Sequence, residues 1–245
     1  MAKKGRLTKD KFGTNMPVDA PLYSRPPIYY EDVEEISLTY ETDGNAVLDI
    51  LPEGLELSEP AIGTVLIRRY PFSTLGPYEE VILIVGCTFQ GKPRSYIPHI
   101  VVNSDIPMAA GREIWGYPKK FAHITLEKDG DLIIGIMERP KGNRICTGVV
   151  RPEKPLPIVE TGKMPGLSFR VIPSPDGSIK PSLAELIETP TETTNVDAYI
   201  GAGFLEFNST SSIDPWHKLA VKKMLSAVYR QFDMVLHPGK VVKRY

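Results

Sequence analysis

Residues 122–138 read AHITLEKDGDLIIGIME, and this stretch gives the strongest local indication of the fold. Two short β-like runs, Ala122 to Glu127 and Leu132 to Glu138, lie on either side of the dipeptide Asp129-Gly130. Asp-Gly is favoured in tight hairpins because these residues tolerate the positive backbone angles that the turn requires. The stretch therefore predicts an antiparallel β-hairpin.

Similar β-like runs precede the hairpin. They are Glu35 to Tyr40, Ala61 to Arg69, Val81 to Thr88 and Tyr96 to Asn103. The chain also contains 23 prolines and 20 glycines, a composition rich in turns, and it shows neither a long heptad run nor a repeat. We expect an α+β protein that is mostly antiparallel β. Periodicity alone does not distinguish an open sandwich from a closed barrel.

Helices are expected to be few and to cover the ends of the sheet. One is predicted over Asp43 to Leu51, with Thr42 or Asp43 as its N-cap. A second is predicted over Pro215 to Val228, where apolar residues recur at helical spacing.

The ends of the chain differ in composition from its body. Residues 1–30 are basic and contain Pro17, Pro21, Pro26 and Pro27, which favours an irregular arm that orders on assembly. The whole chain of 245 residues is 42% hydrophobic and 24% charged, which is enough for one sizeable core. We therefore expect a single domain over residues 31–245.

Charge and hydropathy exclude several classes of partner. The formal net charge of −1 provides no electrostatic footprint for nucleic acid or for an anionic membrane surface. No run approaches the ~20 apolar residues of a membrane span, and Met1 to Lys11 lacks the apolar stretch of a signal peptide. A cytoplasmic location is expected.

Metal, nucleotide and redox chemistry are also disfavoured. The four histidines lack the spacing of a metal site, and Gly201-Ala202-Gly203 lacks the third glycine of a dinucleotide loop. Cys87 and Cys146 stand in apolar or strand-like runs and are expected to be buried free thiols. Neither a metal nor an organic cofactor is expected.

Lys119 and Lys120 stand in the stretch Gly111 to Phe121, whose apolar, glycine-rich character is a poor setting for solvated cations. Burying a lysine, or placing a second ammonium beside it, favours the neutral amine. A neutral amine can attack a carbonyl and form a Schiff base. The alternative interpretation of a Lys-Lys pair is an exposed, solvated one.

The residues Gly111-Arg112-Glu113-Ile114-Trp115-Gly116-Tyr117-Pro118-Lys119-Lys120-Phe121 resemble the lysine motif of the acetoacetate decarboxylase family. Further matches occur in the same order along the chain. They are Pro52 to Pro60, Gly76-Pro77-Tyr78-Glu79-Glu80, Phe169 to Pro173, Asp176-Gly177, Glu185-Leu186, Gly203 to Phe207 and Asp214-Pro215. The resemblance covers residues 20–245. It implies a cone-like β-barrel or double sheet with a few flanking helices, an interior lysine and a homo-oligomer.

The resemblance implies that Lys119 forms the imine with a keto acid and that Lys120 is its companion. Activation of the lysine by burial or by a neighbouring cation is itself a property of the family. A protonated imine accepts the electrons released as CO2 departs, which a neutral ketone does poorly. No cofactor is implied by this chemistry.

The resemblance also assigns roles around the lysine. Glu80 matches the acidic position of the family, whereas Glu79 would point to the opposite face of an extended strand. Tyr78, on the same face as Glu80, would supply a hydroxyl. Trp115 and Tyr117 are predicted to line the pocket, although aromatic residues in such a segment also pack as ordinary core.

The chain departs from the family pattern at two positions that affect the expected reaction. The family's substrate-binding arginine and a second acidic residue correspond here to Val33 and Val65, which cannot replace them. Candidates for compensation are Arg25, Arg68, Arg69 and Arg94, of which Arg25 is assigned to the substrate pocket. Surface placement is the alternative for each.

Three functions follow. The first is a Schiff-base decarboxylase of acetoacetate or a bulkier 3-oxo acid. The second uses the same lysine for aldol addition and dehydration on a 2-oxo acid such as pyruvate, and the valines at positions 33 and 65 favour it. The third is a non-catalytic small-molecule-binding barrel, which the intact Lys119 and Glu80 oppose.

Overall fold

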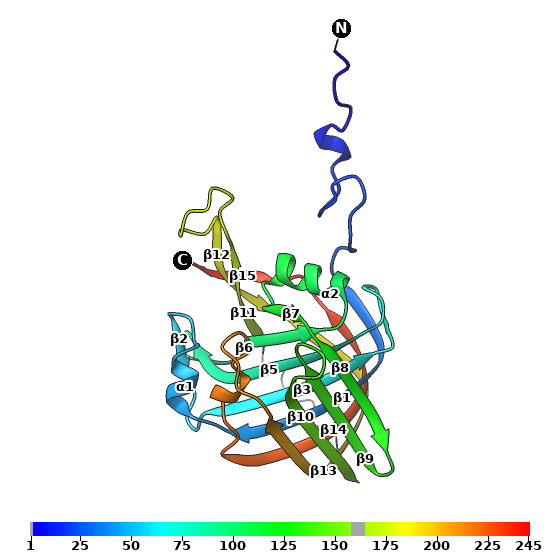
Figure 1. The fold of residues 1–245 in the computed structure, drawn as a ribbon, viewed down its shortest axis with the longest axis vertical. Helices are drawn as coiled ribbons and strands as arrows, with labels where there is room; N and C mark the ends of the chain where they lie inside the picture. The colour runs from blue at the N-terminus through cyan, green and yellow to red at the C-terminus, as the bar shows by residue number, and fades with distance from the viewer. Residues whose placement is uncertain (1, 158–164) are drawn as a thin grey trace.

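Fifteen strands are hydrogen-bonded into one curved sheet in the computed structural model, which describes residues 2–157 and 165–245 (Figure 1). The strands are β1 (Ile28–Glu41), β2 (Leu55–Leu57), β3 (Ile62–Tyr70), β4 (Phe72–Ser73), β5 (Tyr78–Phe89), β6 (Lys92–Val102), β7 (Lys119–Phe121), β8 (His123–Asp129), β9 (Leu132–Glu138), β10 (Arg144–Pro155), β11 (Gly166–Ile172), β12 (Leu183–Thr189), β13 (Thr191–Phe207), β14 (Lys223–Leu236) and β15 (Lys240–Arg244).

Hydrogen bonding follows the strand order β15-β12-β11-β6-β5-β3-β1-β14-β13-β10-β9-β8, with β2, β4 and β7 attached to β5, β1 and β6. Pairing is antiparallel except where β6 meets β11 and β7. Within the described ranges, the end strands β8 and β15 do not pair with each other, so the path stays open. The predicted class, mostly antiparallel β with few helices, is confirmed.

The six strand predictions are confirmed, because each run falls largely within β1, β3, β5, β6, β8 or β9. The predicted hairpin joins β8 and β9, with Asp129 opposite Leu132. Gly130 occupies the turn with φ 58°, the positive value that a side chain would disfavour.

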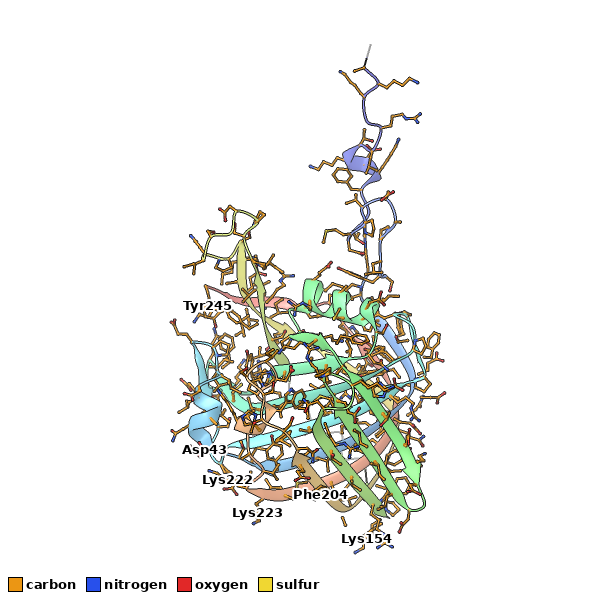
Figure 2. The ribbon with its side chains drawn as sticks, viewed as in Figure 1. Asp43, Lys154, Phe204, Lys222, Lys223 and Tyr245 are labelled. Atoms are coloured by element: carbon orange, nitrogen blue, oxygen red, sulfur yellow. The ribbon has the colours of Figure 1, made fainter. Side chains whose placement is uncertain are left out.

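The first predicted helix forms but is shorter than expected. Helix α1 spans Gly44–Leu48, and the Asp43 carboxylate accepts hydrogen bonds from the backbone N–H groups of Asn45 and Ala46. This is the N-cap that the sequence predicts. Asp43 also lies 2.8 Å from the Lys222 ammonium, which ties α1 to the segment before β14 (Figure 2).

The second predicted helix, over Pro215 to Val228, is wrong. Only a 3-10 turn, Trp216–Lys218, forms there, and β14 begins at Lys223. The side chains of β14 pack in two separate apolar cores. One core contains Ala227 and Tyr229, and the other contains Phe232 and Met234. The strand pairs with β1 on one side and β13 on the other, and this long-range pairing overrides the local helical spacing.

A helical segment with no counterpart among the predicted helices leads into the lysine motif and includes its first five residues. Helix α2 (Asp105–Ala110) continues directly into a π-helical turn, Gly111–Trp115. It lies along one edge of the sheet near β7 (Figure 1). The segment before β1 extends away from the sheet and contains a 3-10 turn at Lys9–Lys11. None of the helices in residues 2–157 and 165–245 is long and apolar enough to cross a membrane.

Two apolar cores form on opposite faces of the central strands. Along β3 and β5, Val65, Ile67 and Leu83 enter the larger core, while Leu66 and Ile82 enter the smaller one. Such alternation is expected because successive side chains of a strand point to opposite faces. Cys87 and Cys146 are both buried in the larger core, as the sequence predicts. The smaller core surrounds the candidate site.

Leu83→Ala is expected to lower the free energy of unfolding by about 2–5 kcal/mol, because Leu83 is fully buried in the larger core. Chemical denaturation measures the change. The matched control is Leu225→Ala, since Leu225 is 46% exposed on β14 and its truncation leaves no cavity. Equal losses in the two variants would contradict the placement of the larger core.

Candidate active site

A buried ion pair joins Lys119, the first residue of β7, to Glu80 on β5. The Lys119 Nζ lies 2.6 Å from the Glu80 Oε1, and both side chains are 5% exposed. Strand β7 reaches this position by pairing in parallel with β6, where Lys119 lies opposite Ile100. The resemblance assigns both residues to the site, and the structure brings them together.

Two glycines shape the segment that delivers Lys119. Gly116 ends the π-helical turn with φ 71°, and a Cβ there would lie 2.3 Å from the Cβ of Arg170. A Cβ on Gly111 would lie 2.6 Å from the Cδ of Lys119. Arg112 then donates from Nη1 to the Lys119 carbonyl at 3.1 Å. The glycine-rich motif therefore provides the space in which the lysine side chain lies.

A row of alternating charges crosses four neighbouring strands and ends at this pair. Arg230 on β14 lies opposite Glu35 on β1, Glu35 lies opposite Arg68 on β3, and Arg68 lies opposite Glu80 on β5. The Arg68 Nε is 2.5 Å from the Glu35 Oε2, and the Arg230 Nε is 2.8 Å from the Glu35 Oε1. We call these four residues the charged row.

Glu35 is fully buried, so its charge depends on the two arginines. Burial would raise the pKa of its carboxyl, but the positive charges of Arg230 and Arg68 and their hydrogen bonds lower it overall. Glu35 is therefore ionised at neutral pH. The two guanidinium groups beside it also pack against the Phe232 ring, whose centroid is 5.1 Å from the Arg230 Cζ and 5.9 Å from the Arg68 Cζ.

Tyrosine hydroxyls complete the polar side of the site. Tyr70 donates to the Glu80 Oε2 at 3.0 Å and accepts from the Arg68 Nη1 at 3.2 Å. The Tyr78 and Tyr30 hydroxyls are 3.2 Å apart. Burial raises the pKa of all three tyrosines, so they remain neutral hydrogen-bonding groups at neutral pH. Tyr78 lies on the same face as Glu80, as the sequence predicts, and its ring centroid is 5.4 Å from the Lys119 Nζ.

The ion pair faces a cavity of about 540 Å³. Its polar lining includes Lys119, Glu80, Arg68, Arg230, Tyr70 and Tyr78. Its apolar lining includes Leu66, Ile82, Ile84, Ile97, Ile100, Met234 and Leu236. Tyr117 also lines the cavity, with its ring centroid 5.8 Å from the Lys119 Nζ. The size lies within the ~300–1,000 Å³ of typical small-molecule sites.

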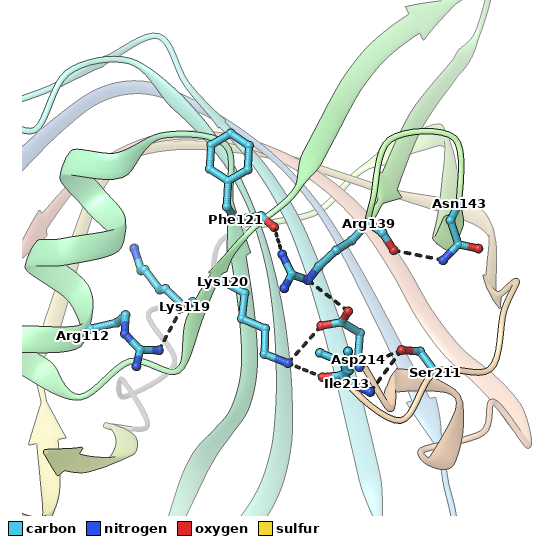
Figure 3. Close-up of polar contacts among 9 residues, drawn as sticks. All are labelled: Arg112, Lys119, Lys120, Phe121, Arg139, Asn143, Ser211, Ile213 and Asp214. Atoms are coloured by element: carbon cyan, nitrogen blue, oxygen red, sulfur yellow. Dashed lines mark hydrogen bonds and ion pairs between the residues drawn. The ribbon is translucent and has the colours of Figure 1, made fainter. Parts of the chain in front are cut away.

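Lys120 is not brought to the cavity. Successive residues of β7 point to opposite faces, and the Lys120 Nζ lies 3.0 Å from the Asp214 Oδ1 (Figure 3). Arg139 pairs with the other oxygen of Asp214 at 3.0 Å. The two lysines are thus adjacent in sequence but on different sides of the strand, and Lys120 is neutralised by its own partner.

Two other predicted pocket residues lie elsewhere. Arg25 is exposed on the segment before β1 and is not among the residues that line the cavity. Trp115 is buried behind the cavity wall, where its Nε1 donates to the His237 carbonyl at 3.0 Å. It stacks on Tyr117 with ring centroids 5.9 Å apart, so it supports a lining residue without lining the cavity itself.

The two valines that replace expected polar residues are both buried. Val65 belongs to the larger core, so its side chain faces away from the cavity. Val33 belongs to the smaller core and follows a bulge at Asp32, whose φ is 54°. The arginines that do line the cavity are Arg68, one of the predicted candidates, and Arg230, which the sequence analysis missed.

Comparison with known proteins gives consistent results. A family model described as acetoacetate decarboxylase (ADC) matches residues 15–245. Acetoacetate decarboxylase 2 of Mesorhizobium japonicum is 32% identical over 235 residues, covering 94% of this chain and 88% of the relative. The crystal structure of acetoacetate decarboxylase from Legionella pneumophila is 28% identical with a TM-score of 0.87, covering 100% of this chain and 98% of that one.

A more distant structure has the same fold. The enduracididine biosynthesis enzyme MppR, solved in complex with pyruvate, is 21% identical with a TM-score of 0.77. The match covers 96% of this chain and 99% of that chain. At this identity the likeness shows the fold alone.

Glu35→Gln is expected to lower the free energy of unfolding by about 3 kcal/mol at neutral pH, because it leaves two guanidinium groups without their carboxylate. Chemical denaturation at several pH values measures this. A carboxyl with a lowered pKa stabilises the fold above its unfolded value, about 4.3, and this contribution is lost as pH falls through the lower folded value. The difference in free energy of unfolding between the wild type and Glu35→Gln should therefore become smaller only at acidic pH.

The control for this prediction is Glu31→Gln, the same change at an exposed position of β1. It should alter stability by no more than about 0.5 kcal/mol. A Glu35→Gln protein as stable as the wild type would show that the charged row does not hold these strands.

Proposed function

The chain belongs to the acetoacetate decarboxylase family, and we propose that it is a Schiff-base decarboxylase of a 3-oxo acid, releasing CO2 and a ketone. One observation carries the proposal. The buried Lys119 amine lies 2.6 Å from the Glu80 carboxylate, at the wall of a cavity of about 540 Å³. A nucleophile beside a group that can move protons is the arrangement that imine formation requires.

In the proposed reaction the neutral Lys119 amine attacks the C3 carbonyl, and loss of water leaves a protonated imine. The bond between C2 and the carboxylate then breaks, CO2 leaves, and its electron pair moves into the imine to give an enamine. Protonation of the enamine carbon and addition of water release the ketone and restore the amine. Glu80 accepts and returns the protons, with its position held by the Tyr70 hydroxyl.

The substrate carboxylate is assigned to Arg68 and Arg230. Among the described residues, the Arg68 Nη2 and the Arg230 Nη1 have no hydrogen-bond partner, although the other nitrogens of both groups are bonded. Arginine is suited to binding carboxylates through two hydrogen bonds. These two groups would supply the function that the family's arginine has at the position of Val33.

Charge balance supports the same assignment. Arg68 and Arg230 carry two positive charges and Glu35 one negative charge. Lys119 and Glu80 form a pair that is neutral overall whichever of the two holds the proton. This set has one more positive than negative charge, so an entering carboxylate would neutralise it. Once CO2 has left, the neutral ketone has no charge to hold it among these groups, which favours release.

Aldol addition and dehydration on a 2-oxo acid such as pyruvate is the alternative. The same amine could form that imine, and Arg68 and Arg230 could hold the carboxylate of a 2-oxo acid as well. A non-catalytic binding protein would not need a lysine paired with a glutamate at a cavity wall. The two enzymatic reactions differ in what they do with acetoacetate, so a single trapping experiment separates them.

Borohydride reduction in the presence of acetoacetate is expected to attach an acetone-derived fragment to Lys119, because reduction fixes the imine left after CO2 departs. Peptide mass spectrometry locates the adduct, and a CO2 assay measures turnover. Lys119→Ala should abolish both signals. The matched control is Lys154→Ala, an exposed lysine of β10, which should retain them.

CO2 release at an undiminished rate in Lys119→Ala would contradict the imine mechanism. An adduct with pyruvate, but none with any 3-oxo acid, would support the aldol alternative instead.

Gly111→Ala is expected to lower kcat by about 10²-fold, because a Cβ at this position would displace the Lys119 side chain from its site. Steady-state assays of CO2 release measure the effect. The matched control is Gly86→Ala on β5, where a Cβ would meet only ordinary contacts at 3.8 Å or more. Full activity in Gly111→Ala would show that the amine position is not critical.

A further inference from the structure

The cavity is much larger than acetoacetate requires. Acetoacetate would occupy at most about 200 Å³ if each carbon and oxygen took the ~30 Å³ share of a liquid water molecule. The cavity measures about 540 Å³. More than half of its volume therefore remains for another part of the ligand, and the residues around that volume show what kind of group fits.

The charged groups that line the cavity from β14, β3 and β5 lie at one level of the sheet, that of the charged row. On β5, Glu80, Ile82 and Ile84 point successively to the cavity side. Only Glu80 belongs to the charged row, and Ile82 and Ile84 continue away from it along the strand. At a rise of about 3.4 Å per residue, Ile84 lies ~14 Å beyond Glu80. This gives a wall long enough for an extended chain.

The strands on either side extend the same apolar wall. Leu66 on β3 lies opposite Ile82, and Ile100 on β6 lies opposite Ile82 from the other side. Ile97 adds a further aliphatic side chain from β6. Strands β3, β5 and β6 lie side by side in Figure 1, so these residues form a continuous surface.

Aliphatic side chains cannot solvate a charged or strongly polar substituent. The five residues Leu66, Ile82, Ile84, Ile97 and Ile100, which we call the aliphatic wall, would instead bind a hydrocarbon chain by removing it from water. The cavity thus combines a carboxylate site, an amine and an apolar wall that extends from the charged row along β5. These three features match the carboxylate, keto carbon and alkyl chain of a 3-oxo acid.

We propose, building on the proposed decarboxylase function, that the substrate is a 3-oxo acid with an apolar chain of several carbons beyond the keto group. Its carboxylate contacts Arg68 and Arg230, its keto carbon lies at the Lys119 amine, and its chain lies along the aliphatic wall. The reaction breaks the bond between C1 and C2, places a proton on C2, and yields CO2 and a long-chain methyl ketone.

The test compares kcat/KM for acetoacetate, 3-oxohexanoate and 3-oxooctanoate, measured by CO2 release from freshly hydrolysed esters. Each added methylene should raise kcat/KM by about fourfold, the effect of burying one methylene group. Ile84→Trp, which fills the far end of the wall, should remove the advantage of 3-oxooctanoate over acetoacetate. Ile179→Trp, at a fully exposed position, should keep the wild-type ratio.

A second variant guards against misfolding. Ile84→Ala keeps the channel open but removes apolar surface. The increase in kcat/KM for each methylene that reaches the far end of the wall should therefore become smaller. A kcat/KM for acetoacetate equal to or above that for 3-oxooctanoate, with activity still dependent on Lys119, would overturn this inference alone. Absence of Lys119-dependent CO2 release from all three acids would instead overturn the proposed function.

Discussion

The fully buried carboxylate of Glu35 is the constraint on which this site depends. It is compensated only when Arg68 and Arg230 lie directly opposite it on the strands to either side. A slip of one residue in either pairing would turn an arginine into the larger apolar core and leave the carboxylate unpaired. The charged row therefore fixes the register of the strands at the centre of the sheet.

That register also positions the reactive groups. Arg68 lies opposite Glu80 on the next strand, and the Tyr70 hydroxyl bridges the two side chains. Glu80 then meets Lys119, which lies on the short strand β7, paired with β6 off the main path of the sheet. The charged row thus has two consequences. It holds the strands in register, and, within the described residues, it leaves two arginine nitrogens unbonded at the cavity next to the buried Lys119 amine.

Local patterns in the sequence predict part of this arrangement. The Asp-Gly turn and the β-like runs identify six of the fifteen described strands, including the hairpin, and motif resemblance assigns both Lys119 and Glu80 to the site. Arg230 was missed because apolar residues at helical spacing just before it predicted a helix, whereas β14 forms through pairing with β1 and β13. Glu35 stands in an acidic run that looks solvated, and only the arginines of distant segments make its burial possible.

The role of Lys120 illustrates the same limit. The adjacency of Lys119 and Lys120 in the sequence suggested a shared environment. Strand alternation and the ion pair with the distant Asp214 instead place the Lys120 charge on the other side of β7. The Lys120 charge is therefore compensated by Asp214 and does not face the cavity that Lys119 lines. Likewise, Val33 signals a lost arginine, yet the guanidinium groups that line the cavity come from β3 and β14, which sequence alone does not bring together.

The most direct test is a crystal structure of the protein reduced with borohydride in the presence of 4-oxopentanoate, a keto acid whose carboxylate is too far from the carbonyl to be lost as CO2. Our account predicts a covalent bond from the Lys119 Nζ to the ligand, with the ligand carboxylate hydrogen-bonded to Arg68 and Arg230. An adduct on another lysine, or a carboxylate bound away from both arginines, would contradict it.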